Sequence, residues 1–137
     1  MNKGDAMDRN EIIDGVKECL LECVRAEADS ITLKSRIIDD LGADSLDLLD
    51  IIFTLERKFK IKIKQGEIVK MAQDGIPPEE FQKNDRLLAK GAERLREVLS
   101  EVNTDEITEG MSTAKIPYLF NVETFVKIVE RNLGKTA

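Results

Sequence analysis

The sequence of 137 residues is long enough for one domain with its own core, and 42% hydrophobic with 35% charged residues is typical of a globular chain. The net charge of −6 leaves no basic surplus to neutralise the phosphates of a nucleic acid. The sequence contains no histidine, which excludes serine–histidine and cysteine–histidine catalysis, and it has no GxSxG or glycine-rich phosphate motif. These features argue against an enzyme.

Membrane, secretory and metal-binding segments are not evident. No segment reaches the roughly 18 apolar residues of a membrane span, and residues 1–13 are polar without the apolar stretch of a secretory signal. We therefore expect a cytoplasmic protein that does not insert stably into a membrane. Cys19 and Cys23 are too few to hold a metal without histidine, so we expect two core or half-buried thiols and no metal site.

The first expected element is an amphipathic helix over residues 10–28, with apolar residues at steps of three and four. Residues 28–43 follow as a long connection with four apolar anchors, which predicts a loop packed onto the core. A second helix should begin at Asp44 and Ser45, because Asp44 is a good N-cap and Asp47 stands where the acid of a capping box belongs. Its broad apolar face predicts contacts on more than one side, at the centre of a small bundle.

Charge changes sign along this second helix. Residues 39–56 contain six acids and no lysine or arginine, whereas residues 57–64 contain five basic residues. One interpretation is a solvated acidic face followed by a basic turn. The other is an acidic docking surface around Ser45 for basic partner proteins.

Three more elements complete the expected all-α fold. A short helix should end at Gly75, and a longer one is expected from Pro78 to about residue 102, with Pro78 near its first position. After a turn-rich connection, residues 121–133 predict a closing amphipathic helix with Asn121 as its cap. The alternation at residues 61–63 is only a weak strand pattern.

Ser45 admits three interpretations: a helix cap, a catalytic nucleophile or an attachment point. Asp44 already supplies the cap, and no base for a nucleophile is found in the sequence. The start of a helix also favours an anion, because free N–H groups and the helix dipole meet there. A phosphodiester attached at Ser45 would be well placed.

The stretch DDLGADSLDLLDIIFTLERKFKIKI resembles the prosthetic-group site of acyl carrier proteins, which have Asp-Ser-Leu at the head of the second helix. The resemblance covers residues 10 to about 63. It implies that Ser45, flanked by Asp44 and Leu46, receives 4′-phosphopantetheine from coenzyme A through a magnesium-dependent transferase. The thiol of this arm would hold acyl groups as thioesters, and the chain would be a carrier and not an enzyme.

The resemblance also implies partners and a docking face. The expected partners are a phosphopantetheinyl transferase, ketosynthases and acyltransferases that present basic patches, with no nucleic acid and with the carrier a monomer. The residues that fall in the docking region are acidic: Asp40, Asp47, Asp50 and Glu56.

The chain departs from ordinary carriers by its length. It is expected to be a single domain with an acyl-carrier-like four-helix bundle, made of a core over residues 8–65, a helical insertion over 66–115 and a closing helix over 116–137. The insertion is interpreted as a brace, a partner-docking helix or cover for a longer acyl chain, with Leu49, Phe53, Leu88 and Leu95 as candidate pocket residues.

A weaker resemblance links residues 44–63 to the enlarged carriers of very-long-chain or hydroxylated acyl groups for outer-membrane lipids. We therefore expect a carrier for fatty acid or specialised lipid synthesis. A polyketide-type carrier, or an unmodified helical adaptor with the same fold, stays as the alternative. A serine hydrolase would need a base near Ser45 that the sequence does not supply.

Overall fold

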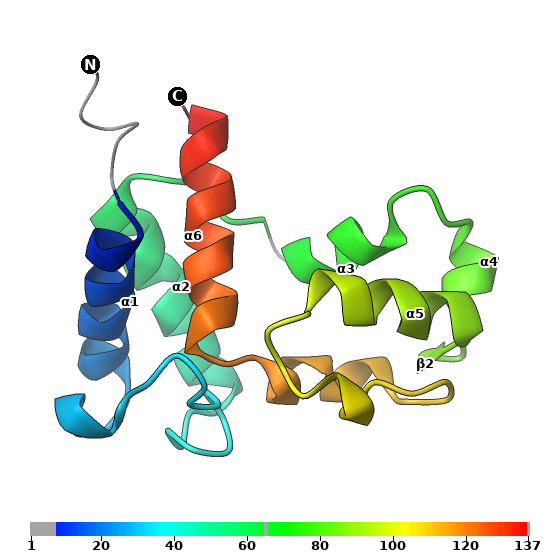
Figure 1. Cartoon of the computed structure of the whole chain (residues 1–137), viewed down its shortest axis with the longest axis horizontal. Coiled ribbons are helices and arrows are strands. Elements are labelled where there is room, and N and C mark those ends of the chain that lie inside the picture. The colour runs from blue at the N-terminus through cyan, green and yellow to red at the C-terminus, as the bar shows by residue number, and fades with distance from the viewer. Residues whose placement is uncertain (1–7, 65, 137) are drawn as a thin grey trace. The chain divides into compact units, whose positions relative to one another are not determined.

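The computed structural model describes residues 8–64 and 66–136, but no side-chain placement for Ser45, Ile68 and residues 134–136. The chain divides into two compact units, one of Met1–Ile63 with Phe120–Ala137 and one of Lys64–Leu119. Figure 1 shows that the described residues are mostly helical, with one very small antiparallel sheet. The prediction of an all-α, carrier-like fold is confirmed in this sense.

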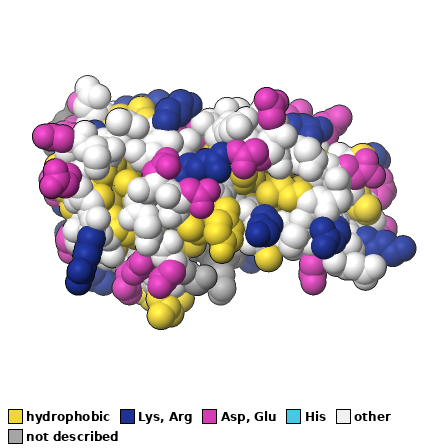
Figure 2. Space-filling model, turned by 90° about the horizontal axis from the view of Figure 1, so that it is seen from below, with side chains coloured by type: hydrophobic (Ala, Val, Ile, Leu, Met, Phe, Trp, Pro, Cys, Tyr) yellow, Lys and Arg dark blue, Asp and Glu magenta, His cyan; other side chains and the backbone are white. Residues whose placement is uncertain are grey.

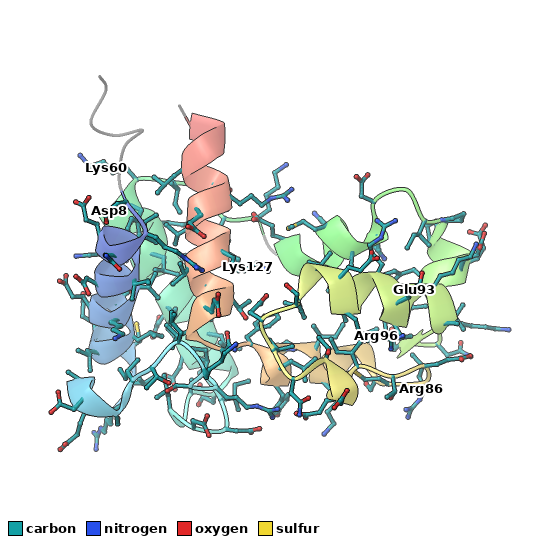
Figure 3. All side chains as sticks on the ribbon, viewed as in Figure 1. Asp8, Lys60, Arg86, Glu93, Arg96 and Lys127 are labelled. Carbon is teal, nitrogen blue, oxygen red and sulfur yellow. The ribbon has the colours of Figure 1, made fainter. Side chains whose placement is uncertain are left out.

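Helix α1 (Arg9–Cys23) begins at a capping box, in which Asp8 and Glu11 accept hydrogen bonds from each other's backbone N–H groups (Figure 3). The expected helix over residues 10–28 is too long, because Val24 is extended and buried where the chain turns back toward the core. The buried face of α1 consists of Ile12, Gly15, Val16, Cys19 and Leu20.

The connection between α1 and α2 is packed down, as predicted. It contains one short 3₁₀ turn, η2 (Ala28–Ser30), and buries Ile31, Ile37 and Leu41. Backbone hydrogen bonds join it to the segment before α6: the Ile37 N–H donates to the Phe120 carbonyl at 3.1 Å. These bonds hold the loop in place without regular secondary structure.

Helix α2 (Ser45–Phe59) packs against α1 and α6 through Ile51, Leu55 and Phe59, and ends at Lys60 in a left-handed conformation. The expected contacts on more than one side are therefore present, but part of the apolar face stays uncovered within this unit. Leu46, Leu49 and Phe53 are 72%, 44% and 53% exposed. Their spacing puts them together on one face of the helix, so α2 presents an apolar stripe beside its buried face.

Helix α6 (Val122–Thr136) closes the first unit. Its predicted cap is confirmed: Asn121 Oδ1 accepts a hydrogen bond from the Thr124 N–H at 3.0 Å, and Thr124 Oγ1 accepts one from the Asn121 N–H at 3.2 Å. Val122, Phe125, Val126 and Val129 are buried, and α6 packs against α1 and α2 (Figure 1). The core of the first unit therefore lies between α1, α2 and α6.

The second unit begins with α3 (Glu67–Gln73), which ends before Gly75 as predicted. The expected single helix from Pro78 to about residue 102 is wrong. The structure has α4 (Pro78–Phe81), then a hairpin, then α5 (Ala89–Val98).

The hairpin pairs β1 (Gln82–Lys83) with β2 (Arg86–Leu87). Asn84 and Asp85 form its turn with φ of 53° and 62°, the left-handed conformation that a two-residue hairpin turn requires and that these residue types tolerate. This local preference interrupts the continuous helix that the apolar periodicity predicted.

The second unit has a core of its own, formed around Phe81, Leu95, Leu99 and Ile107. Two short 3₁₀ segments, η3 (Thr104–Glu106) and η4 (Thr113–Leu119), complete it. Arginine side chains fasten its loops by donating to backbone carbonyls. The three pairs are Arg86 with Gly110 at 3.0 Å, Arg94 with Asp74 at 2.7 Å and Arg96 with Ile107 at 2.7 Å. Figure 3 labels Arg86 and Arg96.

Gly91 lets α5 approach α4 closely, because a Cβ atom there would collide with the backbone carbonyl of Phe81. We expect Gly91→Ala to destabilise the second unit by about 1–3 kcal/mol through overpacking. In an unconstrained helix the same change would stabilise the helix by about 1 kcal/mol. The sign of the change in stability therefore shows whether α5 packs closely against α4 at this glycine.

The measurement is urea unfolding followed by the near-ultraviolet signal of Tyr118, the single tyrosine of the chain, which lies in the second unit. Glu93→Ala, at an exposed position of the same helix (Figure 3), is the matched control and should change stability by less than about 0.5 kcal/mol. An unchanged or higher unfolding midpoint for Gly91→Ala would contradict this account of the packing.

Candidate functional site at the start of helix α2

Asp44 and Asp47 close the first turn of α2 by reciprocal hydrogen bonds. The Asp47 N–H donates to Asp44 Oδ1 at 2.9 Å, and the Asp44 N–H donates to Asp47 Oδ2 at 3.0 Å. The predicted capping box is therefore confirmed. Because Asp44 is the cap, the first helical residue, Ser45, is not needed for that purpose.

The residues before Asp44 hold this helix start against the core. Ala43 is buried and donates its N–H to the Ile37 carbonyl at 3.1 Å, while Leu41, also buried, donates to the Arg36 carbonyl at 3.0 Å. Between them Gly42 has a φ of 77°, which L-residues with side chains rarely adopt. The sequence LGADS thus makes a tight, anchored turn that fixes where α2 begins.

The surroundings of Ser45 fit a covalently attached phosphate-bearing arm. The Ser45 side chain itself lies outside the described residues, but Asp44 is exposed and Leu46 is 72% exposed. Room is therefore available on both sides of the serine. The N-terminal end of the 15-residue helix supplies free backbone N–H groups and the positive end of the helix dipole, which favour an anion.

Three of the four predicted docking acids accept hydrogen bonds from local backbone N–H groups, and of these bonds only that of Asp47 was expected from the sequence. Asp40 accepts a hydrogen bond from the Arg36 N–H at 2.8 Å, and Asp47 belongs to the capping box. Glu56 Oε2 accepts from the Ile63 N–H at 2.8 Å and so fastens the chain after α2. Asp50 is exposed and has no hydrogen bond or ion pair with another described residue.

The four candidate pocket residues are divided between the units. Leu49 and Phe53 lie on the exposed stripe of α2 in the first unit. In the second unit Leu88 is half-buried at the start of α5, and Leu95 is fully buried in the core of that unit. Their role in holding an acyl chain stays a prediction.

A groove at the other end of α2 was not predicted. It has a volume of about 510 Å³ and is lined by Phe53, Glu56, Arg57, Lys60, Ile61 and Lys62. The signal for it was the reversal of charge after Glu56, which the sequence alone does not distinguish from an ordinary solvated turn.

The two cysteines are packing residues. Cys19 is fully buried, and burial raises the pKa of its thiol to about 11, so the thiol stays protonated at neutral pH. Cys23 is half-buried and lies 3.6 Å from the Thr54 hydroxyl, measured between Sγ and Oγ1. Across residues 8–64 and 66–136, acids and cysteines form no cluster able to hold a metal, and no helix is long and apolar enough to cross a membrane.

Comparison with known proteins agrees with this site. Residues 14–74 match the family model described as the phosphopantetheine attachment site. An acyl carrier protein of Campylobacter jejuni (strain RM1221) is 43% identical over 58 residues, which are 42% of this chain and 75% of the relative. The acyl carrier protein AcpXL of Brucella melitensis is 40% identical over 78 residues, 56% of this chain and 84% of the relative. No solved structure matches significantly.

These matches show that the chain belongs to the acyl carrier protein family, a class of carriers and not of enzymes, and its helical fold agrees with that class. Its cofactor is 4′-phosphopantetheine, covalently attached, and the thiol of that arm holds acyl groups as thioesters. Carrier proteins do no chemistry themselves, so this chain is a substrate of the transferase and of the enzymes that use its cargo.

The capping box gives a first test of the site. We expect Asp44→Ala to lower the free energy of unfolding by about 1 kcal/mol, because the Asp47 N–H loses its acceptor. Asp44→Asn keeps an acceptor oxygen and should lose less. Urea unfolding followed by far-ultraviolet circular dichroism measures both. Equal stability of wild type and Asp44→Ala would contradict the assignment of Asp44 as the cap.

The hydrogen bond from Ile63 to Glu56 gives a second test. In Glu56→Ala the Ile63 N–H loses a charged acceptor, so its amide hydrogen exchange should accelerate about tenfold. Glu56→Gln retains an acceptor and should show a smaller effect, and the Ile61 amide, which donates to the backbone carbonyl of residue 56, is the internal control. Unchanged exchange at Ile63 in Glu56→Ala would show that this bond does not hold the loop.

Proposed function

We propose that Ser45 is the residue that carries the arm and that the acyl groups belong to fatty acid or specialised long-chain and hydroxyacyl lipid synthesis. The observation that carries the proposal is the reciprocal Asp44–Asp47 cap directly around Ser45. It leaves the serine free of a capping role at an exposed helix start. The transferase supplies activation of the hydroxyl, so the carrier needs no base of its own.

The lipid assignment is supported by how far the AcpXL match extends. It covers 78 residues of this chain, against 58 for the ordinary carrier of Campylobacter jejuni. The longer match agrees with the resemblance of residues 44–63 to enlarged carriers. We propose a single carrier domain with a core over 8–65, an insertion over 66–115 and a closing helix over 116–137, working in the cytoplasm.

The proposed partners are a phosphopantetheinyl transferase, ketosynthases and acyltransferases with basic patches. Asp50 is the strongest candidate for a direct contact, because it is exposed and makes no hydrogen bond or ion pair with another described residue. The other three acids each accept a local hydrogen bond with one carboxylate oxygen: Asp40, Asp47 and Glu56. A carboxylate has two oxygens and can accept further hydrogen bonds. These acids can therefore shape the local backbone and meet a basic partner at once.

Modification of the full chain tests Ser45 directly. We expect incubation with a phosphopantetheinyl transferase, coenzyme A and magnesium to raise the intact mass by one 4′-phosphopantetheine, and Ser45→Ala to prevent the gain. Ser100→Ala, at an exposed serine of the second unit, is the matched control and should be modified like wild type.

A mass gain that persists in Ser45→Ala would overturn the assignment of the residue. The absence of a gain in every variant would overturn the proposal that this serine is a substrate of the transferase. Far-ultraviolet circular dichroism of each variant confirms that the chain tested is folded.

A further inference from the structure

The surface of the first unit changes sign along α2. The acids Asp39, Asp40, Asp44 and Asp50 are exposed at or before the first half of the helix. The basic residues lie at its end and just after it, and all are exposed: Arg57, Lys58, Lys60 and Lys62. Figure 2 shows acidic, basic and apolar side chains close together on the face that it presents, and Figure 3 labels Lys60 at the end of α2.

The groove at this basic end has uncompensated positive charge. Lys58 is paired with Glu18 at 2.6 Å and does not line the groove. Glu56, the only acid among the described residues that line it, accepts a hydrogen bond from the Ile63 N–H. Lys60 and Lys62 form no ion pair with any residue in the described part of the chain.

The groove also has apolar walls. Phe53 is 53% exposed although it is a large aromatic residue, and Ile61 is buried beside it. The groove, about 510 Å³ in volume, is open and shallow, so it can receive one apolar side chain laid against Phe53 but does not enclose a small ligand. Cations around an apolar recess are complementary to an acidic segment that carries an apolar anchor.

We propose that this groove binds an acidic segment of a partner enzyme, with one apolar side chain of that segment inserted beside Phe53. The proposal rests on the proposed carrier function, because it gives the basic end of α2 a partner contact beside the one proposed for the acidic beginning of the helix. Asp50 and Lys60 are ten helical residues apart, which is about 15 Å along the axis. A cognate partner therefore presents a basic patch and an acidic patch at about this separation, and partners with a basic patch alone bind only half of the face.

Nuclear magnetic resonance titration of the ¹⁵N-labelled full chain tests the proposal. The probe is a seven-residue peptide of six glutamates around a central phenylalanine, with capped ends. Its two controls replace the phenylalanine by serine or the glutamates by lysine. We expect the acidic phenylalanine peptide to shift the amide signals of Phe53, Lys60 and Lys62, and to bind about tenfold more tightly than the serine peptide.

Two variants with the same change of net charge test whether the acidic peptide binds at the groove. Lys60→Glu/Lys62→Glu should weaken binding of the acidic phenylalanine peptide about tenfold. Lys17→Glu/Arg25→Glu changes the net charge equally at two cations outside the groove and should leave the affinity within about twofold. Equal weakening by both variants would show attraction to net charge alone and would overturn the proposal.

Other outcomes overturn it as clearly. Equal binding of the serine peptide would exclude an apolar anchor. Shifts at the groove that appear with rising protein concentration, together with dimers in sedimentation, would assign the groove to a second copy of the chain. Shifts that appear on loading the arm with an octanoyl group would assign it to the cargo.

Failure of the carrier proposal can be distinguished from failure of the groove proposal, because the peptide titration can also be done on the unmodified chain. Intact mass reports the arm, and the amide shifts report the groove. A chain that gains the arm but does not bind the acidic peptide would retain the carrier function and lose this inference.

Discussion

The pair of hydrogen bonds between Asp44 and Asp47 is the interaction on which the rest of the site depends. It satisfies the backbone N–H groups of Asp44 and Asp47 and so fixes Ser45 as the first residue of α2. With the start fixed at Ser45, Ile51 and Leu55 are buried, whereas Leu46 and Phe53 are exposed. The cap therefore sets the position of the serine in the helix, whereas packing against α1 and α6 decides which side chains of α2 are buried.

The exposed face of α2 illustrates how a carrier differs from an enzyme. Among the described residues the acids and cysteines form no metal-binding cluster, and the buried Cys19, which lies on α1, has a raised pKa that keeps its thiol protonated. The proposed function depends instead on what the surface offers: a helix start at which Ser45 is the proposed attachment point, acids around it and apolar side chains left uncovered. Exposed Leu46, Leu49 and Phe53 cost stability relative to burial, which is expected where a surface serves recognition.

The predictions that succeeded were those with a local physical cause. Asp44 and Asn121 were identified as caps because a side-chain acceptor is needed one residue before a helix, and both make that bond. The continuous helix after Pro78 failed because apolar periodicity does not register a two-residue turn at Asn84 and Asp85. Which side chains of α2 are covered, and whether a groove forms at its basic end, depend on how distant segments pack. The periodicity of a single segment carries no information about that packing.

Peptide mapping of the protein isolated from its native cells tests the central claim most directly. Trypsin should release residues 37–57, in which Ser45 is the only serine and Thr54 the only other hydroxyl side chain. We expect fragment masses that place one 4′-phosphopantetheine on Ser45, together with an acyl group whose mass identifies the cargo. An unmodified Ser45, with the arm on Thr54 or absent from this peptide, would contradict the account.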